Sequence, residues 1–221
     1  MKKSDLELRL DVQQELKYEV STRAAQIGVT AKDGIVGLTG NVHSYAAKYA
    51  VVHAAERVAG VKAVTDELKV DLPAFHVRND EDIARAVVYA LEWDVWVPAN
   101  RIKVKVDGGW ITLEGEVDCK YSQTAAENAV RNLTGVKGVS NLITLHTHTP
   151  AVSASELKTN IEEALRRAAE IDADKIDVTV QNDKVILNGK VSSWAERDEA
   201  ECVAWSALGV SEVVDDLEIA A

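Results

Sequence analysis

The feature that most constrains this chain of 221 residues is an internal repeat of about 75 residues. Two sets of glycines mark the repeat. The two sets lie 20 residues apart within each copy and recur at intervals of 75 and then 74 residues: Gly40, Gly115 and Gly189, then Gly60, Gly135 and Gly209. Each glycine of the first set is followed two residues later by valine, and each glycine of the second set directly by valine. A repeat at a fixed interval predicts one small unit used three times.

Two alternating apolar runs precede the first glycine of each copy. In the first copy they are Ile27, Val29 and Ala31, followed by Val36 and Leu38. Alternation with a period of two predicts half-buried strands. Residues that tolerate a positive φ lie between the runs and predict a tight hairpin turn: Asp33 and Gly34, Asp107 and Gly108, Asn182 and Asp183.

Helices are expected on either side of the hairpin. Apolar residues spaced by four open each copy, as in Leu8, Val12 and Leu16, and they share one helix face. Ser4, Asn79 and Ser153 stand before these helices as predicted N-caps; Ser4 and Ser153 are followed three residues later by Glu, which makes full capping-box patterns. An alanine-rich second helix follows each first glycine, and a last apolar strand completes the copy.

The sequence therefore predicts an α+β fold of three tandem α-β-β-α-β domains. Each domain has a three-stranded mixed sheet packed against two helices. We place the domains at residues 1–72, 76–149 and 152–221, joined by short linkers that contain Pro73 and Pro150.

The charge and the motifs of the sequence argue against several classes of function. The net charge is −11, spread as 0 over residues 1–72, −2 over 73–149 and −9 over 150–221. An acidic chain argues against nucleic acid as a partner, because phosphate contacts dominate that affinity. The two cysteines, Cys119 and Cys202, lie in different copies and are expected to be reduced thiols. We expect no enzyme activity, no cofactor and no metal site, since His146 and His148 lack further ligands to complete a set.

The order of elements and the closing motif resemble the BON domain, named for bacterial osmotic-shock-inducible and nodulation proteins. The motif Gly-Val-x-x-Val-x-(Asn/Asp)-x-(Leu/Ile) begins at Gly60, Gly135 and Gly209. The aromatic residue that often follows the first glycine in this family matches Tyr45 and Trp194, whereas the second copy departs with Lys120. The resemblance covers nearly the whole chain. It implies phospholipid binding or the assembly of envelope and stress-response complexes, and it carries no catalytic residues.

Positions at which one copy departs from the others are the candidate contact residues. The second copy has Trp93 and Trp96 in the segment before its hairpin, which could enter a lipid interface or anchor a partner. The alternative is that Trp93 covers its own core and Trp96 packs on a neighbouring domain.

Two further departures are a group of basic residues and another tryptophan. Arg101, Lys103 and Lys105 alternate with apolar residues and predict a basic stripe on the outer sheet face, suited to lipid phosphates or simply to solvent. Trp205 replaces Glu56 and Arg131 of the other copies and predicts a contact between domains or subunits.

Two functional hypotheses follow. In the first, the protein is a non-enzymatic stress-response protein that binds an anionic phospholipid surface. In the second, it is a soluble assembly module that binds a protein or itself. The N-terminal residues include no apolar signal segment, so the sequence as written predicts a cytoplasmic protein, and a periplasmic location would require a leader that has been removed.

Overall fold

A computed structural model describes residues 3–19, 27–145, 153–168 and 171–220. The described chain forms three units, each with the predicted order α-β-β-α-β. Unit 1 contains α1 (Asp5–Tyr18), β1 (Ile27–Lys32), β2 (Ile35–Val42), α2 (Tyr45–Glu56) and β3 (Ala63–Val70). Unit 2 contains α3 (Asp80–Trp93), β4 (Ile102–Asp107), β5 (Trp110–Val117), α4 (Lys120–Arg131) and β6 (Gly138–Leu145). Unit 3 contains α5 (Ala154–Arg167), β7 (Ile176–Gln181), β8 (Lys184–Val191), α6 (Trp194–Trp205) and β9 (Glu212–Ile219).

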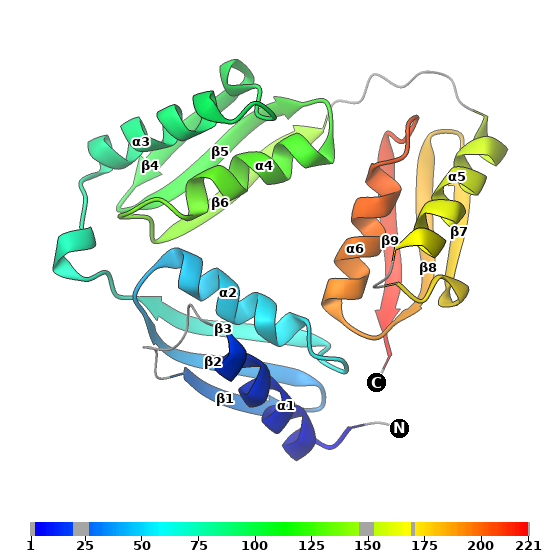
Figure 1. The fold of residues 1–221 in the computed structure, drawn as a ribbon, viewed down its shortest axis with the longest axis horizontal. Helices are drawn as coiled ribbons and strands as arrows, with labels where there is room; N and C mark the ends of the chain where they lie inside the picture. Colours follow the sequence, from blue (N-terminus) through cyan, green and yellow to red (C-terminus); the bar gives the residue numbers. More distant parts are fainter. Residues whose placement is uncertain (1–2, 20–26, 146–152, 169–170, 221) are drawn as a thin grey trace.

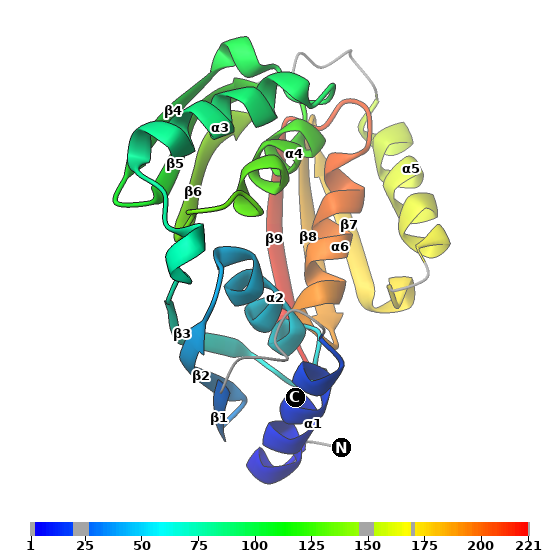
Figure 2. The same ribbon diagram turned by 60° about the vertical axis from the view of Figure 1, so that its left-hand side comes forward.

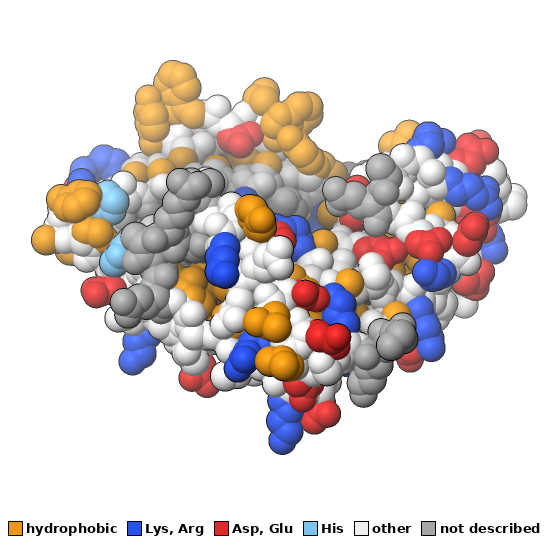
Figure 3. All heavy atoms as spheres, turned by 60° about the horizontal axis from the view of Figure 1, so that its bottom comes forward, with side chains coloured by type: hydrophobic (Ala, Val, Ile, Leu, Met, Phe, Trp, Pro, Cys, Tyr) orange, Lys and Arg blue, Asp and Glu red, His pale blue; other side chains and the backbone are white. Residues whose placement is uncertain are grey.

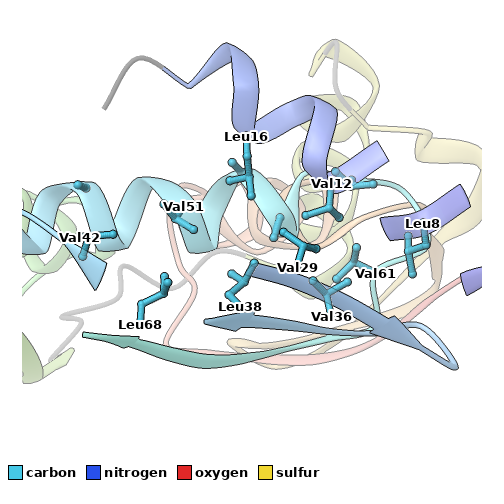
Figure 4. Packing of buried hydrophobic residues seen from close by; sticks show 14 residues of the cluster. Leu8, Val12, Leu16, Val29, Val36, Leu38, Val42, Val51, Val61 and Leu68 are labelled. Atoms are coloured by element: carbon cyan, nitrogen blue, oxygen red, sulfur yellow. The ribbon is translucent and has the colours of Figure 1, made fainter. Parts of the chain in front are cut away.

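Each sheet is mixed, and the second strand of each unit lies in its centre. That strand pairs antiparallel with the first strand through the hairpin and parallel with the third strand. The parallel pairing requires a crossover, which the second helix provides. Both helices cover one face of the sheet, and the apolar side chains of all five elements meet between the layers, as Figure 4 shows for Val12, Leu38 and Leu68 of unit 1.

The local signals explain most of the elements. The predicted N-caps Ser4, Asn79 and Ser153 each accept a backbone N–H from three residues on. The reciprocal bond of a full capping box is present at Ser4. At Ser153 the structure shows the bond from Glu156 N to the serine hydroxyl.

The hairpin of unit 2 corrects one prediction. Its turn is formed by Gly108 and Gly109, whereas we expected Asp107 and Gly108. Both glycines have a positive φ, of 58° and 85°, so the strand continues through Asp107 and the turn falls on the two residues without a side chain.

The first glycine of the repeat is required by a close backbone approach in units 2 and 3. A Cβ at Gly115 would lie 2.2 Å from the carbonyl oxygen of Arg101, and one at Gly189 would lie 2.0 Å from that of Lys175. The second set has a different role, because Gly60, Gly135 and Gly209 adopt left-handed φ angles near the end of the second helix.

The Asn/Asp of the closing motif ties the third strand to the second helix. Its carboxyl or amide oxygen accepts the backbone N–H two residues on in all three units. A long polar side chain of the second helix reaches the same strand. Lys48 forms an ion pair with Asp66 at 2.9 Å, and Arg197 forms one with Asp215 at 2.6 Å. The motif is therefore a structural tether within each unit.

The three units are arranged around a common centre. Figure 1 shows α2, α4 and α6 turned toward the middle of the molecule, and in Figure 2 the same three helices lie next to one another. The segment between units 1 and 2 includes a short 3-10 helix, Ala74–His76. The segment with Pro150 lies outside the described residues. Lys3 and Ala220, from opposite ends of the described chain, line the same pocket of about 200 Å³ between units 1 and 3.

Candidate functional site

One candidate surface is an apolar projection of unit 2, which we call the aromatic tip and define as Tyr89, Trp93, Val95, Trp96 and Tyr121. Trp93, Val95 and Trp96 are 74%, 88% and 60% exposed. Trp96 stands edge-to-face on Tyr121 with ring centroids 5.2 Å apart, and Trp93 lies 5.3 Å from Tyr89. The tip thus consists of two aromatic pairs, one on the last turns of α3 and one that joins the loop after α3 to the start of α4.

The exposure of Trp93 and Trp96 bears on the two interpretations that the sequence left open for these residues. Trp93 and Trp96 are both largely exposed, so Trp93 does not close its own core, and the ring contact that the structure shows for Trp96 is with Tyr121 of its own unit. Val97 takes the core position instead. Large apolar side chains that remain exposed together are typical of an interaction site.

The predicted basic stripe of Arg101, Lys103 and Lys105 is smaller than we expected. Arg101 lies in the 3-10 helix Ala99–Arg101 rather than in the strand, and its guanidinium pairs with Asp118 at 2.8 Å. Lys103 and Lys105 are exposed on the outer face of β4, as predicted from their alternation. Lys103 lies opposite Glu114 in the strand register, so the stripe is partly offset by an acid.

Apart from this stripe, acidic and basic side chains occur side by side on the surface. Figure 3 shows acidic and basic side chains interspersed over the face turned to the viewer, with apolar side chains projecting in groups at its upper edge. Among the described residues no group of three or more His, Cys, Asp or Glu side chains could hold a metal ion. His146 and His148 lie outside the described residues. None of the described helices has the length and apolarity to cross a membrane.

A second candidate region is the central junction, where the second helices of the three units meet. The first residue of each second helix contacts the next unit in a closed cycle. Tyr45 of unit 1 packs against the core of unit 2, and its hydroxyl is hydrogen-bonded to the backbone of Val139. Trp194 of unit 3 packs against the core of unit 1. Lys120 of unit 2 lies 3.7 Å from the Glu201 carboxylate of unit 3.

The last residues of α2 and α4 also face the junction, whereas the last residue of α6 packs within its own unit. The guanidinium of Arg131, the last residue of α4, stands 3.9 Å from the ring centroid of Tyr49 in unit 1. Glu56, the last residue of α2, is within electrostatic reach of Asp198 in unit 3. Trp205, the last residue of α6, is half-buried against its own core and donates its indole N–H to Glu201, the partner of Lys120.

Sequence reasoning treated Tyr45 and Trp194 only as family-like positions and missed the junction. The alignment of the copies contained a signal, because the first and fifth positions of the second helix carry large or charged side chains in most copies. The sequence could not show that these positions meet across units, since that depends on how the units dock.

Comparison with known proteins agrees with the repeat. The family model described as "BON domain" matches residues 4–71, 79–147 and 153–221. Osmotically-inducible protein Y of Escherichia coli is 31% identical over 123 residues, which cover 54% of this chain and 61% of that protein.

Two solved structures of CdsD, a structural protein of the type III secretion system of Chlamydia trachomatis, also match. The first, its C-terminal domain, is 12% identical with a TM-score of 0.27 and covers 99% of this chain and 100% of that chain. The second is 14% identical with a TM-score of 0.25 and covers 94% and 90%. Scores this low carry no argument about function. The three matches of the family model span nearly the whole sequence, and the chain therefore belongs to the BON domain family, of which it carries three tandem copies.

Proposed function

We propose that the protein is a non-enzymatic stress-response protein that binds phospholipid surfaces through the aromatic tip of unit 2. The observation that carries the proposal is the exposure of Trp93, Val95 and Trp96 together at the C-terminal end of α3 and in the loop that follows it. Indole rings are amphipathic and favour the boundary between lipid headgroups and acyl chains. The similarity to an osmotically inducible protein supports the stress-related role.

Apolar insertion accounts for this binding better than charge does. Arg101 is already paired with Asp118, and Lys103 faces Glu114. Only Lys105 of the predicted stripe has no acidic residue opposite it in the strand register, where it faces Thr112. The expected salt dependence is therefore shallow, because each cation near an anionic membrane contributes about 1 kcal/mol and few are available.

Co-sedimentation with vesicles tests the proposal. Vesicles of phosphatidylglycerol and phosphatidylethanolamine should pellet the protein, and the double variant Trp93→Ala, Trp96→Ala should lose at least tenfold in affinity. Removing two interfacial aromatic side chains costs on the order of 2 kcal/mol or more. The matched control is Phe75→Ala, which removes another exposed aromatic side chain away from the tip.

Equal binding by the double variant and the wild type would exclude the tip as the lipid contact. An absence of binding to any vesicle would exclude the proposal altogether. The charge contribution is read separately from Lys103→Glu with Lys105→Glu, for which we expect a smaller loss that shrinks further in high salt.

An assembly role is the second candidate, and the central junction is the observation that favours it. The units of this chain already bind one another through Tyr45 and Trp194, so these BON units present surfaces suited to docking on other BON units. Solution mass measurement distinguishes the two roles. A dimer that dissociates in the Trp93→Ala, Trp96→Ala variant would assign the tip to self-association.

A further inference from the structure

The contact between units 1 and 3 closes the ring of units. These units are not consecutive in the chain, so non-covalent contacts hold them together. The amide of Gly60 donates a hydrogen bond of 3.1 Å to the carbonyl oxygen of Ser192, and Trp194 packs on the core of unit 1. Both contributions of unit 3 come from one short segment, residues 192–194, where β8 ends and α6 begins.

Glu196 holds this segment from within unit 3. The residue is only 6% exposed although it carries a carboxylate. One carboxylate oxygen accepts the backbone N–H and the hydroxyl of Ser192, each at 2.6 Å, and the other accepts the backbone N–H of Asp172 at 3.0 Å. Hydrogen bonds to a carboxylate are short and strong. The loop before β7 and the loop after β8 are therefore tied to one buried side chain.

The indole of Trp194 is also positioned by its own unit. The guanidinium of Arg197 lies 5.0 Å from the centroid of the indole, and Arg197 is itself paired with Asp215 at 2.6 Å. The indole N–H is buried, and among the described residues it has no hydrogen-bond acceptor. No hydrogen bond to the described part of unit 1 therefore orients the indole, so its placement depends on packing and on Arg197.

The other two units have no carboxylate at the position of Glu196. Ala47 of unit 1 and Ser122 of unit 2 occupy it. The contacts made through Tyr45 and Lys120 are to the unit that follows next in the chain, and a covalent connection raises the effective concentration of such neighbours. Unit 3 has no direct link to unit 1, so a segment that already has its docked shape helps most at this contact.

We propose that residues 192–194 are a preformed docking loop for unit 1, and that Glu196 is the positioning residue that keeps this loop in its docked shape before the two units meet. The hydrogen bonds shown for the Glu196 carboxylate all lie within unit 3, so its effect on unit 1 passes through the loop. The entropy cost of ordering the loop then falls on the folding of unit 3 and not on the closure of the ring. This role does not depend on lipid binding by the aromatic tip.

A simpler role for Glu196 is capping of α6. Its backbone N–H donates to the hydroxyl of the N-cap residue Ser193 at 3.2 Å, while its carboxylate reaches back to Ser192. This reciprocal pattern resembles a capping box in which the carboxylate binds one residue before the N-cap. A cap alone would affect the stability of unit 3 but not its affinity for unit 1, so an experiment can separate the two roles.

Hydrogen exchange of three amides in the whole chain makes this separation. The Gly60 amide is bonded to unit 3, so its protection factor follows the closure of the ring. The Ser211 amide, bonded to Asp183 at the other end of β8, reports the stability of unit 3. The Lys62 amide, bonded to Gly34, reports the stability of unit 1.

Glu196→Ala is the central variant. We expect its Gly60 protection factor to fall about five- to thirtyfold, because the backbone of at least one loop residue must then be ordered when the ring closes. Protection of Ser211 and Lys62 should fall by much less. Glu196→Gln keeps one acceptor oxygen and should lose less protection at Gly60 than Glu196→Ala. The matched control is Glu199→Ala, which removes an exposed acid from the same helix and should behave as the wild type.

Three results would overturn the docking role. A fall at Ser211 as large as the fall at Gly60 would mean that Glu196 only stabilises unit 3. Unchanged Gly60 protection in Glu196→Ala would mean that the loop keeps its shape without the carboxylate. A Gly60 amide that is unprotected in the wild-type protein would mean that the loop does not hold unit 1. If Glu196→Ala does not fold, the same comparison of Gly60 with Ser211 is made in Glu196→Gln.

Discussion

The three contacts of the central junction use the same position of the repeat but different chemistry. At the first residue of the second helix, unit 1 has Tyr45 and unit 3 has Trp194, and both aromatic side chains pack on the core of the next unit. Unit 2 has Lys120, which makes an ion pair of 3.7 Å with Glu201. A buried aromatic side chain gains free energy in proportion to its apolar area, whereas a partly exposed ion pair contributes little. The comparison teaches that this ring has two strong contacts and one weak one.

Trp194→Ala should produce the largest effect on the ring. Truncating a fully buried tryptophan costs about 3–5 kcal/mol, and the half-buried Trp194 should lose roughly 2 kcal/mol. We expect the loss to appear as a larger radius of gyration in small-angle scattering and as faster exchange of the Gly60 amide. Trp110→Ala, on the outer sheet face of unit 2, is the control that should leave both unchanged.

Tyr45→Ala should give the next largest effect, about 1–2 kcal/mol, at the contact between units 1 and 2. The variant removes both the packing on unit 2 and the hydrogen bond to Val139. Because units 1 and 2 are also joined by the chain, we expect a lower melting temperature with little change in overall dimensions. A loss as small as that of Lys120→Ala would contradict the distinction between aromatic and ionic contacts.

Lys120→Ala should have the smallest effect, below about 1 kcal/mol, because both partners of its ion pair are about one-third exposed. The difference from wild type should vanish at 0.5 M salt, since screening already removes most of the interaction. Thermal unfolding at low and high salt measures both quantities. A large, salt-independent loss would mean that the contact between units 2 and 3 depends on the packing of the lysine stem.

The sequence predicted the unit in detail because each element has a local cause. The spacing of Leu8, Val12 and Leu16 sets a helix face, and the caps at Ser4 and Asn79 set the helix starts. The hairpin of unit 2 was displaced by one residue because Gly108 is followed by a second glycine, and both Asp-Gly and Gly-Gly suit a tight turn.

The candidate sites were less predictable because they depend on which apolar side chains find no place in the core and remain exposed. Val97 fills the core of unit 2, and this leaves Trp93 and Trp96 in solvent, but a sequence pattern cannot rank three neighbouring apolar residues for one core position. Arg101 was assigned to the strand by alternation, yet the strand begins one residue later and the guanidinium meets Asp118. To predict the junction, one would need to know how the three units are placed relative to one another, and local sequence patterns do not give this information.

Lys3 and Ala220 line one pocket, so the two ends of the described chain lie close together and the three units form a nearly closed ring. The three units follow one another around the centre in the order of the sequence, and the last one returns to the first. A short peptide joining these two ends and a cut in the segment between units 1 and 2 would produce a circular permutant with the order 2, 3, 1. In that permutant the chain itself would link units 3 and 1, which Trp194 now holds together. The contact of Tyr45 between units 1 and 2 would then be the one that closes the ring without a covalent link.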